Sequence, residues 1–344
     1  MSTPEKASKP ETLAADLAHE YFEIEANARQ LVGELDLNFR LTSVEGEKYI
    51  LKLAHPEADQ NNLDLQNGIM SHLATKNLPF LLPGVISNKT GDHITETPDE
   101  NGQIRLLRLL TWVPGRVLAK VNPHTDDLLE NLGRNCGLLD KALQDFDHPA
   151  AHRYFKWDIS QTLWIKEDLH YIEDQGQKEL ARHFLDYFEK AVHPRLDALR
   201  RSVIYNDAND YNVLVSDDSP NVDIQGFIDF GDAVFTQTIN ELAIAIAYTA
   251  MAKPDPLESA LHLVRGYHSA FPIMEPELEV LYGLVAARLL ISVTCSARNK
   301  KQNPENEYLL ISELPAWDLL QKWRKIHPSF AFYSFRNACG YESC

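Results

Sequence analysis

The fold is decided by two short stretches of sequence, Ile204-Tyr-Asn-Asp207-Ala-Asn-Asp-Tyr-Asn212-Val-Leu-Val and Ile228-Asp229-Phe-Gly231-Asp232. Asn212 to Val215 and Gln225 to Ile228 are rich in strand formers and flank the polar turn Asp217 to Asn221, which is typical of a β-hairpin. Such a hairpin would bring Asn212 and Asp229 to the same end, beside Asp207.

Phosphoryl transfer requires side chains of these types. One carboxylate accepts the proton of the attacking hydroxyl, while a carboxylate and an amide hold the magnesium ion that neutralises the phosphates. The order Asp207, Asn212 and then Asp-Phe-Gly is that of protein-kinase-like catalytic lobes. We favour this interpretation over polar turns without function, because the motif is joined to Asp-Phe-Gly across the predicted hairpin.

Upstream of the motif, short segments of strand formers and one helical segment predict a small α+β lobe. A helix over Leu13 to Tyr21 precedes it. The expected strands are Arg29 to Val32, Asn38 to Ser43, Lys48 to Leu53, Val85 to Thr97 and Ile104 to Leu110, with a helix over Leu63 to Thr75.

Beyond Pro114 and Gly115 the apolar spacing becomes helical. The expected helices are Thr125 to Phe146, Leu180 to Arg201, Asn240 to Met251, Pro256 to Ala270 and Glu275 to Arg298. The sequence therefore predicts an α+β chain with a bilobal, protein-kinase-like fold, in which a small β-rich N-lobe precedes a larger, mainly helical C-lobe. The expected parts are a flexible tail (1–12), the N-lobe (13–110), a hinge (111–115) and the C-lobe (116–344).

One lysine, Lys52, lies inside the apolar strand Lys48 to Leu53. Lysines avoid full burial unless they are paired, so Lys52 either reaches solvent at an edge or meets phosphate. The preceding loop, Gly33 to Phe39, includes Asn38 and would cover the phosphates. It has no Gly-x-Gly-x-x-Gly pattern, and the chain has no Walker-type loop.

The segment Arg108-Leu-Leu-Thr-Trp112-Val-Pro114-Gly115 joins the two predicted lobes. An apolar strand that ends in a Pro-Gly turn can present backbone groups to the edge of an adenine. The residues in question are Leu110, Thr111, Trp112 and Val113. The alternative is an ordinary linker.

Bulk composition excludes several classes of protein. A net charge of −17 argues against nucleic-acid binding, which requires clustered Lys and Arg. The four cysteines lack metal-ligand spacing and fit a reducing compartment. The most apolar stretch, Leu281 to Cys295, contains Arg288 and is too short to span a bilayer. We expect a cytoplasmic protein without membrane partners, and the sequence leaves its oligomeric state open.

The succession of motifs resembles the aminoglycoside phosphotransferase and choline kinase superfamily. Within it, the chain is most similar to hydroxylysine kinase-like proteins and to the kinase-like domains fused to class III aminotransferases. The likeness covers nearly the whole chain and includes Phe155-Lys-Trp157-Asp158, Asn306-Glu-Tyr-Leu and Ser312-Glu313. It implies that Asp207 is the catalytic base, that Asn212 and Asp229 bind Mg²⁺, that Lys52 holds the phosphates, and that Leu110 to Val113 bind adenine.

The chain departs from the superfamily pattern in three ways. Tyr205 and Asn206 stand where His-Gly is usual, Gln66 stands where a glutamate normally pairs with the lysine, and Glu241 stands where an aspartate commonly braces the catalytic loop. None of these changes removes the base or a metal ligand. They leave one alternative from another class, a catalytically silent module that binds a nucleotide.

The resemblance implies ATP or GTP as the phosphate donor and an amino acid or amino alcohol as the acceptor, with 5-hydroxylysine first. Homoserine, choline, ethanolamine and aminoglycosides are the alternatives. Such acceptors need carboxylates for their ammonium groups and a cation for a carboxylate. Candidate substrate residues are Trp157, Asp158, Asp210, Arg288 and Glu307, with Glu313 and Arg298 as further charged candidates. Arg288 is either a substrate anchor or a buried ion-pair partner.

Overall fold

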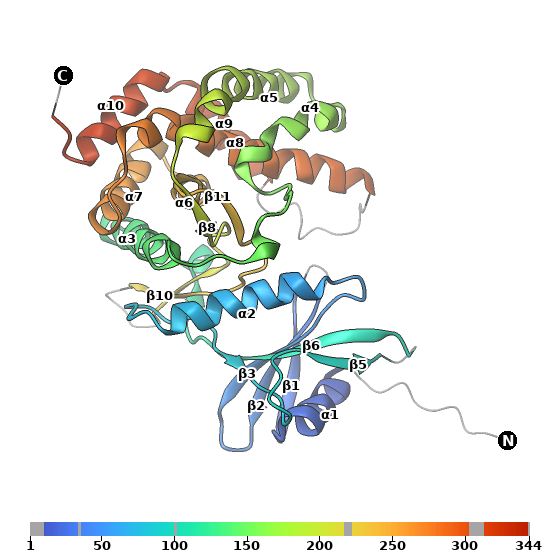
Figure 1. Ribbon diagram of the computed structural model, residues 1–344. Coiled ribbons are helices and arrows are strands. Elements are labelled where there is room, and N and C mark those ends of the chain that lie inside the picture. Colours follow the sequence, from blue (N-terminus) through green and yellow to red (C-terminus); the bar gives the residue numbers. More distant parts are fainter. Residues whose placement is uncertain (1–9, 34–35, 100–101, 217–221, 303–312, 343–344) are drawn as a thin grey trace. The chain divides into compact units, whose positions relative to one another are not determined.

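The computed structural model describes residues 10–33, 36–99, 102–216, 222–302 and 313–342 (Figure 1). Within these residues the chain forms two compact units. The first ends at Pro114 and the second begins at Gly115, although Leu78–Phe80 belongs with the second unit. The division falls inside the segment 111–115 that the sequence predicted as a hinge.

The first unit is built on a six-stranded antiparallel sheet in the order β1-β2-β3-β6-β4, with β5 also paired to β6. Two helices accompany the sheet. The elements are α1 (Pro10–Phe22), β1 (Ala26–Leu31), β2 (Leu37–Ser43), β3 (Lys48–Leu53), α2 (Gln60–Ala74), β4 (Val85–Ile86), β5 (Thr95–Pro98) and β6 (Ile104–Thr111).

Alternation along the strands separates the two faces of this sheet. Leu51 and Leu53 on β3 and Leu107 and Leu109 on β6 join the apolar side of α1 in one core. Lys52 and Arg108, which are register partners, point to the opposite face. Arg108 bonds to residues of α2, so the two helices cover opposite faces of the sheet (Figure 1).

The predicted strand Val85 to Thr97 is wrong as a single element, because a tight turn divides it into β4 and β5. Asn88 Oδ1 accepts hydrogen bonds from the backbone amides of Thr90 and Asp92, and Gly91 has a φ of 94°. An asparagine and a glycine at these positions favour a turn over a continuous strand. Helix α1 begins at Pro10, within the segment expected to be a tail, and proline suits the first turn of a helix.

The second unit is mainly helical and contains two small antiparallel strand groups, β7-β9-β10 and β8-β11. Its α-helices are α3 (Asp126–Leu143), α4 (Ile165–Asp168), α5 (Gln175–Tyr187), α6 (Ile239–Thr249), α7 (Pro256–Ala270), α8 (Glu275–Gln302), α9 (Glu313–Arg324) and α10 (Pro328–Ala338). Its strands are β7 (Arg116–Val117), β8 (Arg201–Ile204), β9 (Val213–Val215), β10 (Ile224–Phe227) and β11 (Val234–Gln237). Short 3₁₀ segments cover Leu118–Lys120, Pro149–Ala151, Ile159–Trp164, Leu169–Tyr171 and His193–Ala198, and Phe188–Val192 is a π-helical turn.

The helix predicted over Leu180 to Arg201 is shorter than expected. It ends at Tyr187 and passes through the π-helical and 3₁₀ segments before β8 begins at Arg201. Pro194 lacks the amide that an α-helix needs at that point. The pairing of β8 with β11 was not predicted.

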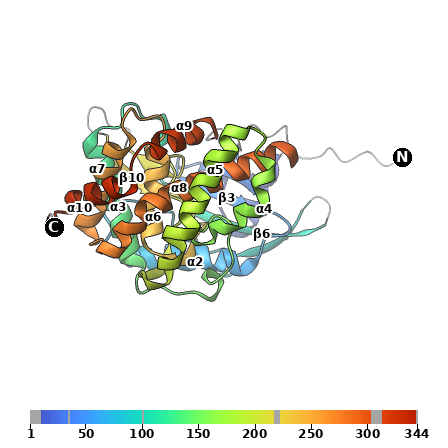
Figure 2. The ribbon, with the colours of Figure 1, turned by 90° about the horizontal axis from the view of Figure 1, so that it is seen from above.

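Helix α8 lies among the other helices of this unit (Figure 2). Among the described residues it is the one helix long and apolar enough to cross a membrane, and it is longer than the apolar stretch Leu281 to Cys295. However, 94% of its apolar window is buried inside the protein. That burial is typical of a core helix.

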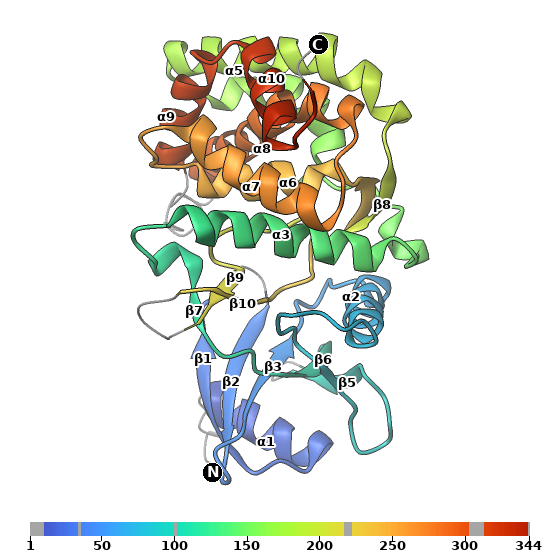
Figure 3. The same ribbon diagram turned by 90° about the vertical axis from the view of Figure 1, so that its left-hand side faces the viewer.

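Helices α3 and α7 pack against each other through glycines (Figure 3). A Cβ on Gly133 of α3 would come within 2.1 Å of the Leu263 carbonyl oxygen, and one on Gly266 of α7 within 1.8 Å of the Glu130 carbonyl oxygen. Both obstacles are backbone atoms, which cannot move aside as a flexible side chain can. The two glycines therefore set the distance between the helices.

We expect Gly266→Ala to lower the free energy of unfolding by about 1–3 kcal/mol or more, since the helices must separate to admit the methyl group. Gly176→Ala in α5 is the matched control, because its Cβ would meet only the Asp174 side chain at 3.3 Å. Removing a helical glycine there should be neutral or stabilise by about 0.5–1 kcal/mol. Thermal and urea denaturation measure both; equal stabilities for the two variants would contradict the close contact.

Candidate active site

The predicted hairpin is present as β9 and β10, which pair antiparallel with Val213 opposite Phe227. One residue beyond the strands, the Ile228 amide donates a hydrogen bond to the Asn212 carbonyl oxygen at 3.0 Å. Asn212 therefore lies next to the residue that precedes Asp229, as the sequence predicted. The turn Asp217 to Asn221 lies outside the described residues.

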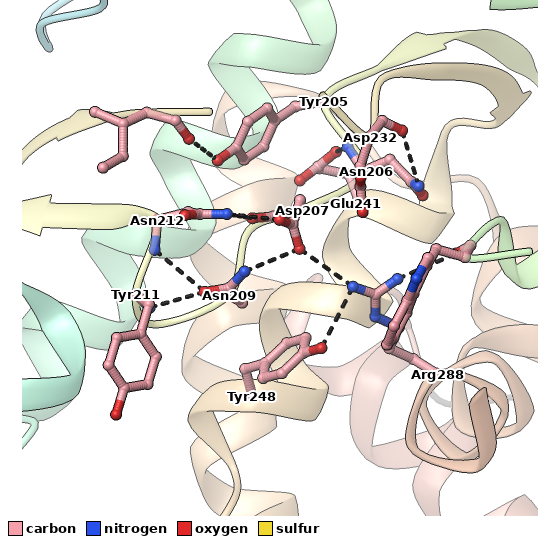
Figure 4. Close-up of polar contacts among 12 residues, drawn as sticks. Tyr205, Asn206, Asp207, Asn209, Tyr211, Asn212, Asp232, Glu241, Tyr248 and Arg288 are labelled. Atoms are coloured by element: carbon pink, nitrogen blue, oxygen red, sulfur yellow. Dashed lines mark hydrogen bonds and ion pairs between the residues drawn. The ribbon is translucent and has the colours of Figure 1, made fainter. Parts of the chain in front are cut away.

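The Asp207 carboxylate is surrounded by three side-chain donors (Figure 4). Its Oδ1 accepts hydrogen bonds from Asn209 Nδ2 at 2.9 Å and from Arg288 Nη2 at 3.2 Å. Its Oδ2 accepts one from Asn212 Nδ2 at 2.5 Å. The structure thus brings together three residues that the sequence singled out, Asp207, Asn212 and Arg288, and Arg288 from α8 is an ion-pair partner of Asp207.

The orientation of the Asn212 side chain follows from this contact. Its NH₂ group must face Asp207, because two oxygens at 2.5 Å would repel each other. The amide oxygen is then directed away from Asp207 and has the chemistry of a hard-metal ligand.

Asp229 follows β10 in a left-handed backbone conformation, with a φ of 62°. Its Oδ1 accepts a hydrogen bond from the Gly231 amide at 3.2 Å, which fixes the carboxylate at the turn. Among the described residues there is no cluster of three or more His, Cys, Asp or Glu side chains at metal distance. A site of one carboxylate and one amide oxygen fits Mg²⁺, which binds few protein ligands and fills its shell with phosphate and water oxygens.

The loop before Asp207 is held by buried polar contacts. Glu241 on α6 accepts a hydrogen bond from the Asn206 amide at 2.6 Å, and Asn206 Nδ2 donates to the Asp232 carbonyl oxygen at 3.1 Å. Burial raises the pKa of Glu241 to about 7, although the surrounding backbone amides and Arg288 lower it. Glu241 therefore braces the loop, as expected for the residue at this position.

Asn206 has a φ of 66°, which explains a departure seen in the sequence. The superfamily usually has glycine at this position, and asparagine is one of the few other residues that adopt left-handed backbone readily. The neighbouring Tyr205 is fully buried, and its hydroxyl donates to the Ile228 carbonyl oxygen. The tyrosine thus ties the loop to the hairpin.

Two carboxyl groups in this region titrate far from their usual range. Burial raises the pKa of Asp207 well above its ordinary value, and the charge of Asp232 adds to that rise, while Arg288 and Asn209 lower it. Burial also raises the pKa of Asp210 to about 6. Because Arg288 is the cation that contacts Asp207, it offsets part of this destabilisation of the carboxylate.

Three of the predicted substrate residues are occupied by contacts within the protein. Asp158 is 3% exposed and accepts hydrogen bonds from Ser160 and Thr236. Arg288 stacks on the Trp157 ring at 4.7 Å. The charges of Asp158 and Arg288 already have partners, which argues against direct substrate contacts by these two residues. Trp157 is half-buried, and a substrate contact by it stays a prediction.

The other charged candidates have different outcomes. Glu307 lies outside the described residues, as do Asn306 and Ser312. Glu313 pairs with Lys300 at 2.7 Å, and Arg298 pairs with Asp168 at 3.2 Å. Asp210, three residues from Asp207, stays a candidate.

In the first unit, Lys52 on β3 has Asn38 on β2 and Arg108 on β6 as register partners. Gln66 Oε1 accepts a hydrogen bond from Arg108 Nη2 at 2.7 Å, a pairing that the sequence did not predict. The glutamine that was expected to support Lys52 thus bonds to the buried arginine beside it. Lys52 therefore lies beside a buried arginine that is held by α2.

The loop before β2 is tightly packed where it is described. A Cβ on Gly33 would come within 2.5 Å of the Asp36 carbonyl oxygen and 2.7 Å of Asn38 Nδ2. Gly33 is therefore required for the loop to turn at this point. Residues 34 and 35 lie outside the described residues.

Backbone pairing within the first unit uses some of the amides of the predicted adenine-binding segment. Leu110 and Thr111 belong to β6, and the Thr111 amide donates to the Gly84 carbonyl oxygen at 2.9 Å. The Trp112 amide donates to the Lys48 carbonyl oxygen at 3.3 Å. Pairing within the unit thus occupies the amides of Thr111 and Trp112. The Val113 amide is the candidate hydrogen-bond donor to the adenine ring.

Sequence reasoning missed Asn209 and Tyr248, which both contribute to the surroundings of Asp207. Asn209 Oδ1 also accepts from the Tyr211 amide at 2.8 Å, an Asx turn that the sequence Asp-Ala-Asn-Asp could have suggested. Tyr248 accepts a hydrogen bond from Arg288 at 3.3 Å. Nothing in the spacing of α6 points to that contact.

Comparison of the chain with known proteins identifies its family. The chain belongs to the phosphotransferase enzyme family, whose model matches residues 28–279. It is a kinase-like enzyme that transfers phosphate to a hydroxyl group, and the family implies a nucleotide donor and a small-molecule acceptor.

Individual relatives narrow the comparison. The chain is 30% identical to the hydroxylysine kinase of Danio rerio over 328 residues, which is 91% of each protein. It is 28% identical to the homoserine kinase of Agrobacterium fabrum over 249 residues, or 71% of each. An aminopropanol kinase structure has a TM-score of 0.69 at 19% identity, over 91% of this chain and 97% of that one. An amicoumacin kinase, solved with AMP-PNP and Ca²⁺, has the same TM-score at 16% identity, over 94% and 97%.

Replacing Asn206 tests the left-handed loop. Asn206→Ala and Asn206→Gly both lose the hydrogen bond to Asp232, but only alanine is strained at a φ of 66°. We expect the alanine variant to be less stable than the glycine variant by about 1 kcal/mol and to have the lower kcat. Thermal denaturation and steady-state assays of the two variants measure this difference. A more stable alanine variant would contradict it.

Proposed function

We propose that this enzyme transfers the γ-phosphate of a purine nucleoside triphosphate to the hydroxyl of a small amino acid, with 5-hydroxylysine as the first candidate. The observation that carries the proposal is the arrangement around Asp207. A carboxylate that can take a proton lies in contact with Asn212, whose amide oxygen is available to a metal ion. Asp229 follows the strand paired with that of Asn212.

Asp207 is the proposed base. Two donors already occupy its Oδ1, whereas Oδ2 accepts a hydrogen bond only from Asn212 among the residues that the structure describes. Each carboxylate oxygen has about two acceptor positions, so Oδ2 keeps one for the acceptor hydroxyl. As that hydroxyl attacks the γ-phosphorus, its proton passes to Oδ2, and the nucleoside diphosphate leaves.

Asn212 and Asp229 are the proposed ligands of Mg²⁺. The metal ion would neutralise the phosphate charge that develops during transfer. The fixed amide of Asn212 couples the two tasks, because the same side chain holds the base and offers its oxygen to the metal. Lys52 is the proposed phosphate contact. The Val113 amide is the proposed hydrogen-bond donor to the purine ring of the nucleotide, which fits ATP or GTP.

The choice of acceptor rests on the curated relatives. Several hydroxylysine kinases match at 27–30% identity over most of the chain. In this chain, Asp210 lies close to Asp207 in sequence and is the proposed partner of an acceptor ammonium group. Its raised pKa fits a carboxylate that gains from a cationic partner.

The alternative of a silent nucleotide-binding module is disfavoured by the same contacts. Binding a nucleotide requires the metal ligands and Lys52, but it does not require a carboxylate held by three donors. Asp207 has that support, and Glu241 braces its loop.

Asp207→Asn tests the base. The change keeps the shape of the side chain and removes its ability to accept a proton, so kcat should fall by roughly 100-fold or more. Metal-dependent nucleotide binding, measured by calorimetry, should change little. Asp186→Asn on the exposed side of α5 is the control and should keep full turnover. A near-normal kcat for Asp207→Asn would remove Asp207 from this role.

An acceptor panel tests the substrate. Purified enzyme is assayed with 5-hydroxylysine, homoserine, choline, ethanolamine and an aminoglycoside, each with ATP and with GTP, while nucleoside diphosphate release is followed. We expect the highest kcat/KM for 5-hydroxylysine. A far higher kcat/KM for choline or an aminoglycoside would overturn the acceptor and leave the kinase reaction standing. Turnover of none would favour the silent module.

A further inference from the structure

Arg288 is the most thoroughly enclosed cation near the proposed base. It lies on the core helix α8 and is 2% exposed. Its guanidinium joins three separate parts of the second unit, donating to Trp157 O at 3.1 Å, Asp207 Oδ1 at 3.2 Å and Tyr248 OH at 3.3 Å. The rings of Trp157 and Tyr248 lie 4.7 Å and 5.4 Å from its central carbon. Figure 4 shows Arg288 directed at Asp207 and Tyr248.

Because of these contacts, Arg288 cannot bind the carboxylate of an acceptor substrate through two parallel hydrogen bonds. Bidentate binding of a carboxylate uses two adjacent N–H groups of the guanidinium. Both donors of Nη2 are taken by Asp207 and Tyr248, and Nε is buried without a partner among the described residues. The side chain is therefore directed at the base and not at a ligand.

The position of Arg288 determines which oxygen of Asp207 is used. Together with Asn209 it fills both acceptor positions of Oδ1. Without Arg288 the carboxylate would lose one of the contacts that fix the orientation of its plane. A partial rotation about the Cβ–Cγ bond would then turn the oxygen that faces Asn212 out of line with the Asn212 amide.

We infer that Arg288 is a positioning residue for the phosphoryl transfer proposed above: it holds Oδ1 of Asp207 so that Oδ2 alone receives the proton of the acceptor hydroxyl. The inference rests on that proposed function. In the step itself, the O–H bond of the acceptor breaks and its proton goes to Oδ2. A bond forms between the acceptor oxygen and the γ-phosphorus, and the bond from that phosphorus to the β-phosphate oxygen breaks.

The shape of the side chain matters as much as its charge. A guanidinium is planar and presents several donors in fixed directions, whereas an ammonium is a single point of charge. Arg288 uses that geometry to reach a carbonyl, a carboxylate and a hydroxyl at once. Lysine at this position would keep the charge and lose the simultaneous contacts.

The test compares Arg288→Ala and Arg288→Lys with the wild-type enzyme in steady-state assays with the acceptor that the wild type prefers. We expect kcat to fall by about 100-fold in Arg288→Ala, with KM for nucleotide and acceptor little changed. Guanidinium ion in the assay should restore roughly tenfold of that loss by filling the vacated site. Arg265→Ala on α7, which breaks an exposed ion pair with Glu130 of α3, is the matched control and should be unaffected.

A double variant separates positioning from a structural effect. If Arg288 acts through Asp207, its removal from an Asp207→Asn enzyme should change kcat by no more than about 2-fold. An undiminished loss in that background would overturn the inference. So would a raised acceptor KM with an unchanged kcat, which is the behaviour of a substrate anchor.

If Arg288→Ala fails to fold, the Arg288→Lys variant tests whether Arg288 positions Asp207. This variant should fold, lose kcat without a change in KM, and gain nothing from guanidinium. Wild-type kcat in Arg288→Lys would overturn the inference while the proposed kinase reaction stood. A wild-type enzyme that transfers phosphate to no acceptor would overturn the proposed function first.

Discussion

The loop that carries Asp207 has no strand pairing of its own, and one buried carboxylate from α6 holds it in place. Glu241 accepts the Asn206 amide at 2.6 Å, and this bond fixes the backbone from which the side chain of Asp207 projects. An ionised acceptor binds an amide more strongly than a neutral one. Burial works against that ionised form, because it raises the pKa of Glu241 to about 7. Every contact of Asp207 depends on this balance between a strong hydrogen bond and the cost of burying its acceptor.

Charge around Asp207 is balanced by the buried guanidinium of Arg288. Burial and the neighbouring Asp232 disfavour the ionised form of Asp207, and Arg288 opposes both effects. Such a pair is costly to remove from water, but the Asp207 carboxylate accepts three hydrogen bonds from side chains, which offset part of that cost. The net charge of −17 for the whole chain therefore does not describe the balance of positive and negative charge around Asp207.

The catalytic hairpin was predictable because its signals are local. Asp207, Asn212 and Asp229 are joined by a few residues and one turn, so strand propensity and motif order determined their arrangement. The long-range contacts were not predictable. The sequence gives no indication that Arg288 meets Asp207 or that Gln66 bonds to Arg108, because these pairs depend on how helices dock. The split between β4 and β5 has a local cause, because the turn formed by Asn88 and Gly91 outweighs the strand propensity of the residues around it.

The long separation between Arg288 and Asp207 bears on how the enzyme is made. The two residues are 81 positions apart, so a growing chain emerges from the ribosome with the catalytic loop well before the arginine that neutralises it. The same holds for α3, whose glycine-lined partner α7 begins at Pro256. Contacts between distant segments carry a loop-closure cost that is met only when both segments are present. Folding of this unit therefore waits until α7 and α8 have been synthesised, and a nascent chain that lacks them leaves the apolar faces that they cover exposed to water.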